Sequence, residues 1–150
     1  MLHLPAPGDE LVVVDIEGWK MGLSVCYDLR FPPFYEALQR LADGLDCLLV
    51  PAAFTVPTGA AHWEVLLRAR AIEQQCYVVA AAQAGQHNEK RASYGHSMIV
   101  DPWGKVASQL YDEKRGVCYA VLEKDRVEEV RRNMPIREHY RPLVYSKVSK

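Results

Sequence analysis

The strongest constraint on the fold is an abrupt change of pattern between Lys20 and Pro33. The apolar run 21–25 stops at Cys26, and prolines follow at positions 32 and 33. Proline suits the first turn of a helix, so the pattern predicts a strand, a sharp turn and then a helix. Cys26 stands at the corner, as a nucleophile does on a tight elbow. The alternative is that Cys26 is a small buried hydrophobe at a strand end.

A strand-helix-strand unit surrounds this corner. Residues 11–16 and 20–25 predict a hairpin that leads to Cys26. Residues 33–42 have apolar side chains at helical spacing, and the short apolar run 46–50 predicts the next strand. A strand, a helix and a strand with short links usually produce a parallel sheet, so the fold class is α/β.

The rest of the chain continues to alternate between helix and strand signals. An irregular connection at 52–61 follows a strand end, where open α/β sheets place ligands, so we interpret it as a pocket wall. The remaining predicted elements are a helix at 62–75, a strand at 77–82, a loop at 83–93, a hairpin of 96–100 with 105–110, a strand at 117–122, a helix at 124–133 and a tail at 135–150.

Composition and charge exclude several function classes. With 150 residues, 49% of them hydrophobic and 25% charged, the chain has the composition of one soluble globular domain. Its 18 basic residues are interspersed with 19 acidic ones, for a net charge of −1, which argues against nucleic acid and anionic membranes as partners. The four cysteines form no CxxC pair, so no metal site and no cofactor is expected. Without a leader-like segment or a membrane-spanning run, the predicted location is cytoplasmic.

Three blocks of the sequence resemble the nitrilase superfamily, the carbon-nitrogen hydrolases. The segment Val25-Cys26-Tyr27-Asp28-Leu29-Arg30-Phe31-Pro32 is similar to the nucleophile segment, 62–73 to the helix that follows, and 94–104 to a late hairpin. The resemblance runs from about Lys20 to Leu143. It implies that 1–150 is a partial carbon-nitrogen hydrolase domain that lacks its N-terminal part. The implied fold is the C-terminal half of a four-layer α-β-β-α sandwich, with 135–150 as a tail.

The resemblance implies amide hydrolysis through a thioester on Cys26. A cysteine attacks an amide carbon as a thiolate, and the geometry of an elbow places the N–H of Tyr27 where it could hold a developing oxyanion. The superfamily also uses a Glu as general base and a Lys, both upstream of the cysteine. Only 25 residues precede Cys26, and we do not assign those roles to Glu10, Glu17 or Lys20. Hydrolysis by this chain alone is therefore in doubt.

Residues 61–104 are most similar to nitrilase-like amidases that hydrolyse deaminated glutathione. That resemblance implies that Arg30 binds a substrate carboxylate, for which a planar guanidinium is well suited. It also implies that Phe54 and Thr58 belong to the pocket wall. The alternatives are that Arg30 pairs with Asp28, and that Phe54 and Thr58 have packing and turn roles. Proline at position 33, where the family usually has Glu, weakens the transfer of substrate preference.

Three functions remain open. The first is an amidase acting on small carboxylate-bearing amides such as deaminated glutathione. The second is an incompetent fragment that acts only by association, and the third is an ω-amidase of 2-oxoglutaramate-type substrates. A Cys-His hydrolase with His62 as the partner of Cys26 is disfavoured, because His62 matches a family position that caps or packs. The apolar residues of the tail could lie on another subunit, so we expect a homodimer or higher homo-oligomer.

Overall fold

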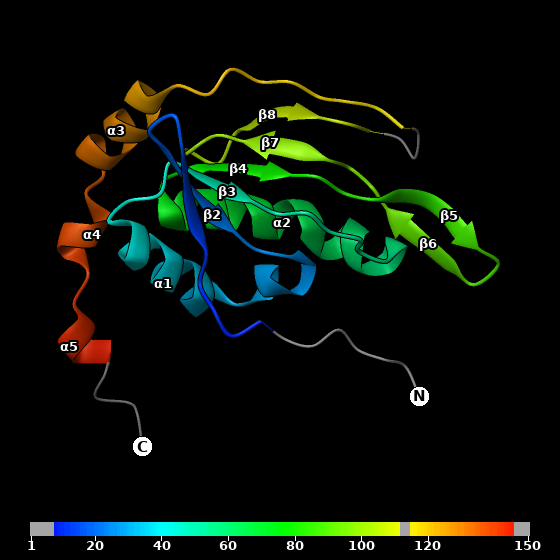
Figure 1. Ribbon diagram of the computed structural model, residues 1–150, viewed down its shortest axis with the longest axis horizontal. Coiled ribbons are helices and arrows are strands. Elements are labelled where there is room, and N and C mark those ends of the chain that lie inside the picture. Colours follow the sequence, from blue (N-terminus) through cyan, green and yellow to red (C-terminus); the bar gives the residue numbers. More distant parts are fainter. Residues whose placement is uncertain (1–7, 112–114, 146–150) are drawn as a thin grey trace.

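The computed structural model of the protein describes residues 8–111 and 115–145. A six-stranded sheet has the order β1-β2-β3-β4-β7-β8, and β5 and β6 form a separate hairpin at one end of the molecule (Figure 1). The strands are β1 (Val13–Ile16), β2 (Trp19–Leu23), β3 (Cys47–Leu49), β4 (Tyr77–Ala80), β5 (Ala84–Asn88), β6 (Arg91–Tyr94), β7 (Met98–Val100) and β8 (Val106–Gln109). The helices are η1 (Cys26–Arg30), α1 (Pro32–Ala42), α2 (Val56–Gln74), α3 (Lys124–Asn133), α4 (Ile136–His139) and α5 (Pro142–Tyr145).

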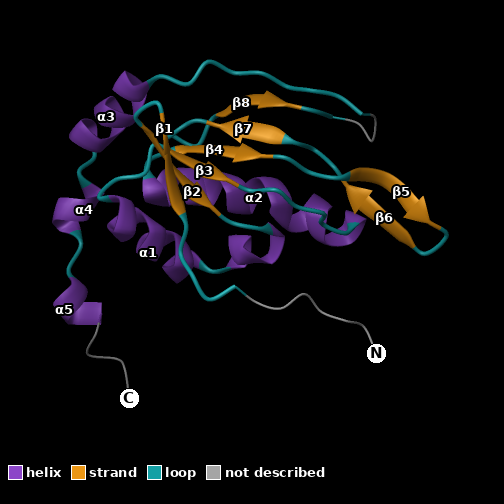
Figure 2. Ribbon diagram, viewed as in Figure 1, coloured by secondary structure: helices purple, strands orange, loops and turns teal. Residues whose placement is uncertain are grey.

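The predicted strand-helix-strand units are confirmed. Strands β2, β3 and β4 are parallel, with Gly22, Leu48 and Val78 in register, and α1 and α2 are the two crossovers. Both helices lie on the same face of the sheet (Figure 2). Because β2 and β3 are parallel neighbours, their carboxyl ends meet at one edge of the sheet, and Cys26 follows the first of them.

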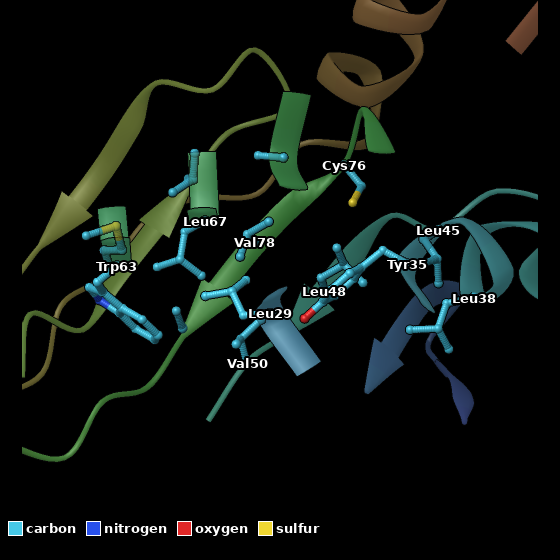
Figure 3. Packing of buried hydrophobic residues seen from close by; sticks show 14 of the residues in the cluster. Leu29, Tyr35, Leu38, Leu45, Leu48, Val50, Trp63, Leu67, Cys76 and Val78 are labelled. Carbon is cyan, nitrogen blue, oxygen red and sulfur yellow. The ribbon is translucent and has the colours of Figure 1, made fainter. Parts of the chain in front are cut away.

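The principal core lies between this sheet and the two crossover helices. Figure 3 shows Leu48 of β3, Val50 just after it and Val78 of β4 in one cluster with Leu38 of α1 and Leu67 of α2. All five are fully buried. The other face of the sheet carries a smaller cluster, in which Cys47 and Tyr77 contact Val127 of α3. The chain therefore supplies one helix layer and one sheet layer of an α/β fold.

Two element predictions are wrong in part, and a third is wrong. The helix α2 begins at Val56 rather than at residue 62, because Thr55 and Pro57 start a helix even though Gly59 lies within its first turns. Residues 83–93 are mostly a hairpin, not a loop, and their polar composition hid it because β5 is largely exposed. Residues 117–122 form no strand; Val121 is 84% exposed.

The hairpin of β5 and β6 is fixed to α2 by a glycine. A methyl group at Gly59 would overlap Cβ and Cγ of Tyr94 and come within 2.5 Å of its Cδ1. Next to this contact, the N–H of Tyr94 donates to the carbonyl oxygen of Phe54 over 2.9 Å. Because the crowded atoms lie close to the Tyr94 backbone, a rotation of the ring cannot relieve the overlap. The hairpin therefore needs glycine at position 59.

We predict that Gly59→Ala lowers the free energy of unfolding by about 1 to 3 kcal/mol, the range typical of an over-packed site. Urea denaturation measures the change. Gly8→Ala is the matched control, because no atom lies within 4 Å of a methyl group there. Equal stability of the two variants would contradict the close approach of Tyr94 to α2.

Candidate active site

Cys26 occupies a strained backbone position at the edge of the sheet. It is the first residue of the 3-10 helix η1, and its φ is 48°, in the left-handed region that non-glycine residues rarely adopt. Its N–H donates to the carbonyl oxygen of Pro51, which follows β3, over 2.9 Å. The thiol residue is half-buried and packs against the edge of the principal core. The sequence predicted the corner but not the 3-10 helix.

Hydrogen bonds of Ser24 and Tyr35 hold the end of the strand that leads to Cys26. Both the N–H and the hydroxyl of the buried Ser24 donate to the carbonyl oxygen of Leu49, each over 3.1 Å. The hydroxyl of Tyr35, on α1, donates to Ser24 Oγ over 3.0 Å. Burial raises the pKa of Tyr35 to about 12, so the phenol stays protonated and remains a donor at neutral pH. These bonds tie β2, β3 and α1 together directly under the elbow.

The far end of η1 is held by a buried arginine. Arg70 of α2 is 3% exposed, and its Nε and Nη2 both donate to the carbonyl oxygen of Leu29, over 3.2 and 3.0 Å. Its Nη1 pairs with Glu73 over 2.6 Å, and its guanidinium lies 5.5 Å from the centre of the Tyr35 ring. The sequence predicted a helix here but not the bonds of Arg70 to Leu29.

Arg30, the last residue of η1, lies among three other side chains. Its guanidinium carbon is 5.6 Å from the centre of the Tyr27 ring and 5.1 Å from that of Phe54. Its Nη1 lies 3.3 Å from Nδ1 of His62 on α2. The carboxylate of Asp28, the alternative partner from the sequence, accepts a hydrogen bond from the N–H of Val25 over 2.8 Å. The structure therefore brings Tyr27, Arg30 and Phe54 together.

The other predicted pocket residues have strong local contacts. Phe54 is 7% exposed and packs against Trp63, with ring centres 4.9 Å apart. The hydroxyl of Thr58 lies 2.8 Å from that of Thr55, in the first turn of α2. The side chain of Tyr27 is 65% exposed, and its N–H lies in the first turn of η1, where N–H groups have no acceptor within the helix.

Of the three side chains that the sequence analysis set aside as base and cation, two lie away from Cys26, whereas Glu10 precedes β1 at the end of the β1–β2 hairpin that leads to Cys26. Glu17 is in the turn between β1 and β2, and Lys20, near the start of β2, donates to the carbonyl oxygen of Ala42 over 2.7 Å. Both are at the end of β2 opposite to Cys26. The sequence also missed the contact of His62 with Arg30, although a histidine one turn after Thr58 was a signal that this helix face is polar.

The described residues hold a pocket of about 550 Å³ away from the elbow. It lies between α1, the end of α2 and the C-terminal segment, and none of its lining residues belongs to η1. Within 8–111 and 115–145, no three or more His, Cys, Asp or Glu side chains are grouped so that they could hold a metal ion. No helix in that part of the chain is long and apolar enough to span a membrane.

The chain belongs to the carbon-nitrogen hydrolase family, whose sequence profile matches residues 2–132. It is similar to the human deaminated glutathione amidase, with 53% identity over 142 residues, which are 95% of this chain and 42% of that protein. The chain thus spans less than half the length of this curated relative.

Two solved structures have the same fold over most of the chain. The Caenorhabditis elegans NitFhit protein is 49% identical with a TM-score of 0.88, over 93% of this chain and 34% of that one. A member of branch 10 of the nitrilase superfamily from Saccharomyces cerevisiae is 33% identical with a TM-score of 0.80, over 87% and 47%. The predicted family and α/β fold class are confirmed.

We predict that a mild electrophile such as iodoacetamide modifies Cys26 faster than any other cysteine of the folded protein. Cys47 and Cys76 are fully buried, and burial raises the pKa of Cys47 to about 12 and also raises that of Cys76. Both therefore stay protonated and unreactive near neutral pH. Cys118 is half-buried like Cys26 but lies outside the elbow, so it is the internal control.

Peptide mapping by mass spectrometry after a short exposure gives the four rates. Equal labelling of Cys26 and Cys118 would show that the elbow confers no special reactivity. Rapid labelling of Cys47 or Cys76 would contradict the packing of the core.

Proposed function

We propose that the chain carries the nucleophile and the carboxylate-binding arginine of an amidase that acts on small carboxylate-bearing amides such as deaminated glutathione. The observation that carries the proposal is the single turn η1, which holds Cys26 at a left-handed corner and presents Arg30 from its other end. The human relative named above is called a deaminated glutathione amidase. Because the chain spans less than half of that relative, the activity is proposed for the whole protein to which it belongs.

The chemistry is an acyl transfer through a thioester. The Cys26 thiolate adds to the amide carbonyl carbon, and the carbonyl oxygen takes up the negative charge. The tetrahedral intermediate collapses with cleavage of the C–N bond, and the amine leaves with a proton. Water then adds to the thioester, and a second collapse releases the carboxylic acid and restores the thiol. In this scheme the N–H of Tyr27 donates to the oxyanion in both tetrahedral intermediates.

Proton transfer is the step to which we assign no residue of this chain. Water is a poor nucleophile toward a thioester unless a base removes its proton, and the family uses a Glu as that base and a Lys to stabilise the tetrahedral intermediate. Glu17 and Lys20 lie at the opposite end of β2 from Cys26. We infer that the general base and the cation come from another part of the protein or from a partner chain. On this proposal, 1–150 is part of a carbon-nitrogen hydrolase domain.

We predict that the purified 150-residue chain releases at most one equivalent of product from deaminated glutathione. Acylation of Cys26 can proceed slowly, but without a base the thioester persists, because catalytic groups that act as a unit lose most of their effect when one is missing. Product is followed over many equivalents of substrate, beside Cys26→Ala as the control. Mass spectrometry of the protein detects the acyl group.

Sustained turnover abolished by Cys26→Ala would show that this chain supplies its own base and would overturn the inference of a missing part. Turnover of 2-oxoglutaramate in place of deaminated glutathione would favour the ω-amidase. An absence of both acylation and turnover would favour a fragment that acts only by association.

We predict that Arg30→Lys lowers kcat/KM for acidic amides at least about tenfold more than for neutral amides in the complete enzyme, since it keeps the charge but loses the fork that binds a carboxylate at two points. Steady-state kinetics on an acidic amide and its neutral analogue measure the difference. Arg40→Lys is the control, because Arg40 pairs with Glu36 on the exposed face of α1. An equal loss on both substrates would assign Arg30 a purely structural role.

We propose that the protein is a cytoplasmic homodimer or higher oligomer, in which the apolar residues of the C-terminal tail contact a second copy; residues 146–150 of this tail lie outside the described residues. The support is the apolar surface of α5, where Val144 is 47% exposed. The four cysteines are free thiols, as is usual in a reducing compartment. Light scattering measures the mass in solution, and a monomer at micromolar concentration would contradict the oligomer.

A further inference from the structure

The contact between Arg30 and His62 joins two elements that are distant in the sequence. Arg30 ends η1, whereas His62 lies in the first half of α2, 32 positions later. Both side chains are accessible to solvent. The acyl-transfer scheme uses neither ring nitrogen of His62. The proposed acyl transfer therefore does not explain the contact between Arg30 and His62.

The donors and acceptors of the two groups decide which tautomer of His62 can form a hydrogen bond with Arg30. A guanidinium has five N–H donors and no acceptor. The 3.3 Å contact between Arg30 Nη1 and His62 Nδ1 is therefore a hydrogen bond only if Nδ1 carries a lone pair. The tautomer that accepts this bond is the neutral ring with its proton on Nε2, and in that tautomer the bond holds the guanidinium against α2.

The aromatic neighbours of Arg30 do not fix how its guanidinium is rotated, and the contact with His62 does. The rings of Tyr27 and Phe54 attract the guanidinium to their faces, at 5.6 and 5.1 Å, but attraction to a π-face does not fix rotation of the group about its own centre. A hydrogen bond at Nη1 does. Two-point binding of a carboxylate requires a particular edge of the guanidinium to face the ligand, so this rotation matters.

Phe54 is itself a rigid support. It packs against Trp63, which directly follows His62 on α2, and the indole Nε1 of Trp63 donates to the carbonyl oxygen of His96 over 2.8 Å. The ring that Arg30 covers and the histidine that it bonds are thus fixed to the same turn of α2. Two of the three neighbours of the guanidinium, Phe54 and His62, are thus tied to α2, and the third, Tyr27, lies on η1.

We propose that His62 is a positioning residue that orients the guanidinium of Arg30 for two-point binding of a substrate carboxylate. This inference rests on the proposed role of Arg30 in the amidase. His62 accepts one N–H of the guanidinium and leaves an edge of the group for the ligand. Its loss should weaken selection for carboxylate-bearing compounds without reducing the reactivity of Cys26 toward neutral ones.

The test compares two alkylating reagents on the 150-residue chain, so it does not require turnover. Iodoacetate carries a carboxylate and iodoacetamide is its neutral analogue. The ratio of their rates at Cys26, divided by the same ratio at Cys118, reports carboxylate selection within one sample. The variants are His62→Ala, His62→Asn, Arg30→Lys and, as a control, His139→Ala on the distant helix α4.

We expect His62→Ala to lower this normalised ratio about threefold to tenfold, the net effect of losing one typical hydrogen bond at a solvent-accessible position. His62→Asn should recover most of the ratio, because the Asn carbonyl oxygen stands near the position of Nδ1 and accepts the same bond. The iodoacetamide rate at Cys26 should stay constant in both variants, and His139→Ala should change neither rate. Far-ultraviolet circular dichroism and the unfolding midpoint confirm that each variant is folded.

The outcomes separate the two proposals. If Arg30→Lys lowers the ratio and His62→Ala does not, the role of His62 is wrong and that of Arg30 stands. If neither changes it, carboxylate selection by Arg30 is wrong too. Equal losses in His62→Ala and His62→Asn would also overturn the inference, since the acceptor would not matter. A ratio that depends on His62 in a complete protein without amidase activity would leave the positioning role intact and refute the proposed function.

Discussion

The buried guanidinium of Arg70 is the interaction on which the elbow depends. It donates twice to the carbonyl oxygen of Leu29 and once to Glu73, so a charge that would be costly to bury has partners on each side. Because Arg70 belongs to the long helix α2, it ties the position of η1 to the same helix that covers the sheet. Movement of α2 would therefore carry the turn, and Cys26 with it.

The left-handed backbone conformation of Cys26 is stabilised by hydrogen bonds on both sides of η1. A non-glycine residue in that region costs roughly 1 to 2 kcal/mol. The opposing contributions are the bond from Cys26 to Pro51 before the turn and the bonds of Arg70 to Leu29 near its end. Ser24 and Tyr35 fix the strand that enters it. The strain at Cys26 is thus over-determined by contacts from β3, α1 and α2, which is typical of functional sites.

The parts of the fold that the sequence predicted are those governed by local patterns. The strand before Cys26, the helix after Pro32 and the buried strands β3 and β4 follow from apolar spacing and from proline. The hairpin of β5 and β6 escaped prediction because β5 is polar and largely exposed, and because the close approach of Tyr94 to α2 depends on Gly59, which is distant in the chain. A polar segment that pairs at the surface has no periodic signal to detect.

The candidate site also has a part that local sequence patterns predict and a part that depends on residues distant in the chain. Cys26, Tyr27 and Arg30 lie within one turn, so a motif of eight residues was enough to single them out, whereas their partners come from α2 and from the end of β3. Arg70 and Arg30 show why residue type alone could not assign roles. Arg70 donates to the carbonyl oxygen of Leu29 and to Glu73, so its role is to hold η1 in place.

The second arginine has the opposite character. Arg30 lies against two aromatic faces and one histidine nitrogen, contacts that orient a guanidinium without using all of its five donors. Burial distinguishes the two, and burial is a property of the assembled fold. The same helix, α2, thus holds the turn through Arg70 and orients the exposed group through His62. The placement of Cys26 and the orientation of the Arg30 guanidinium therefore both depend on α2, and the contacts from β3 and α1 complete the support of Cys26.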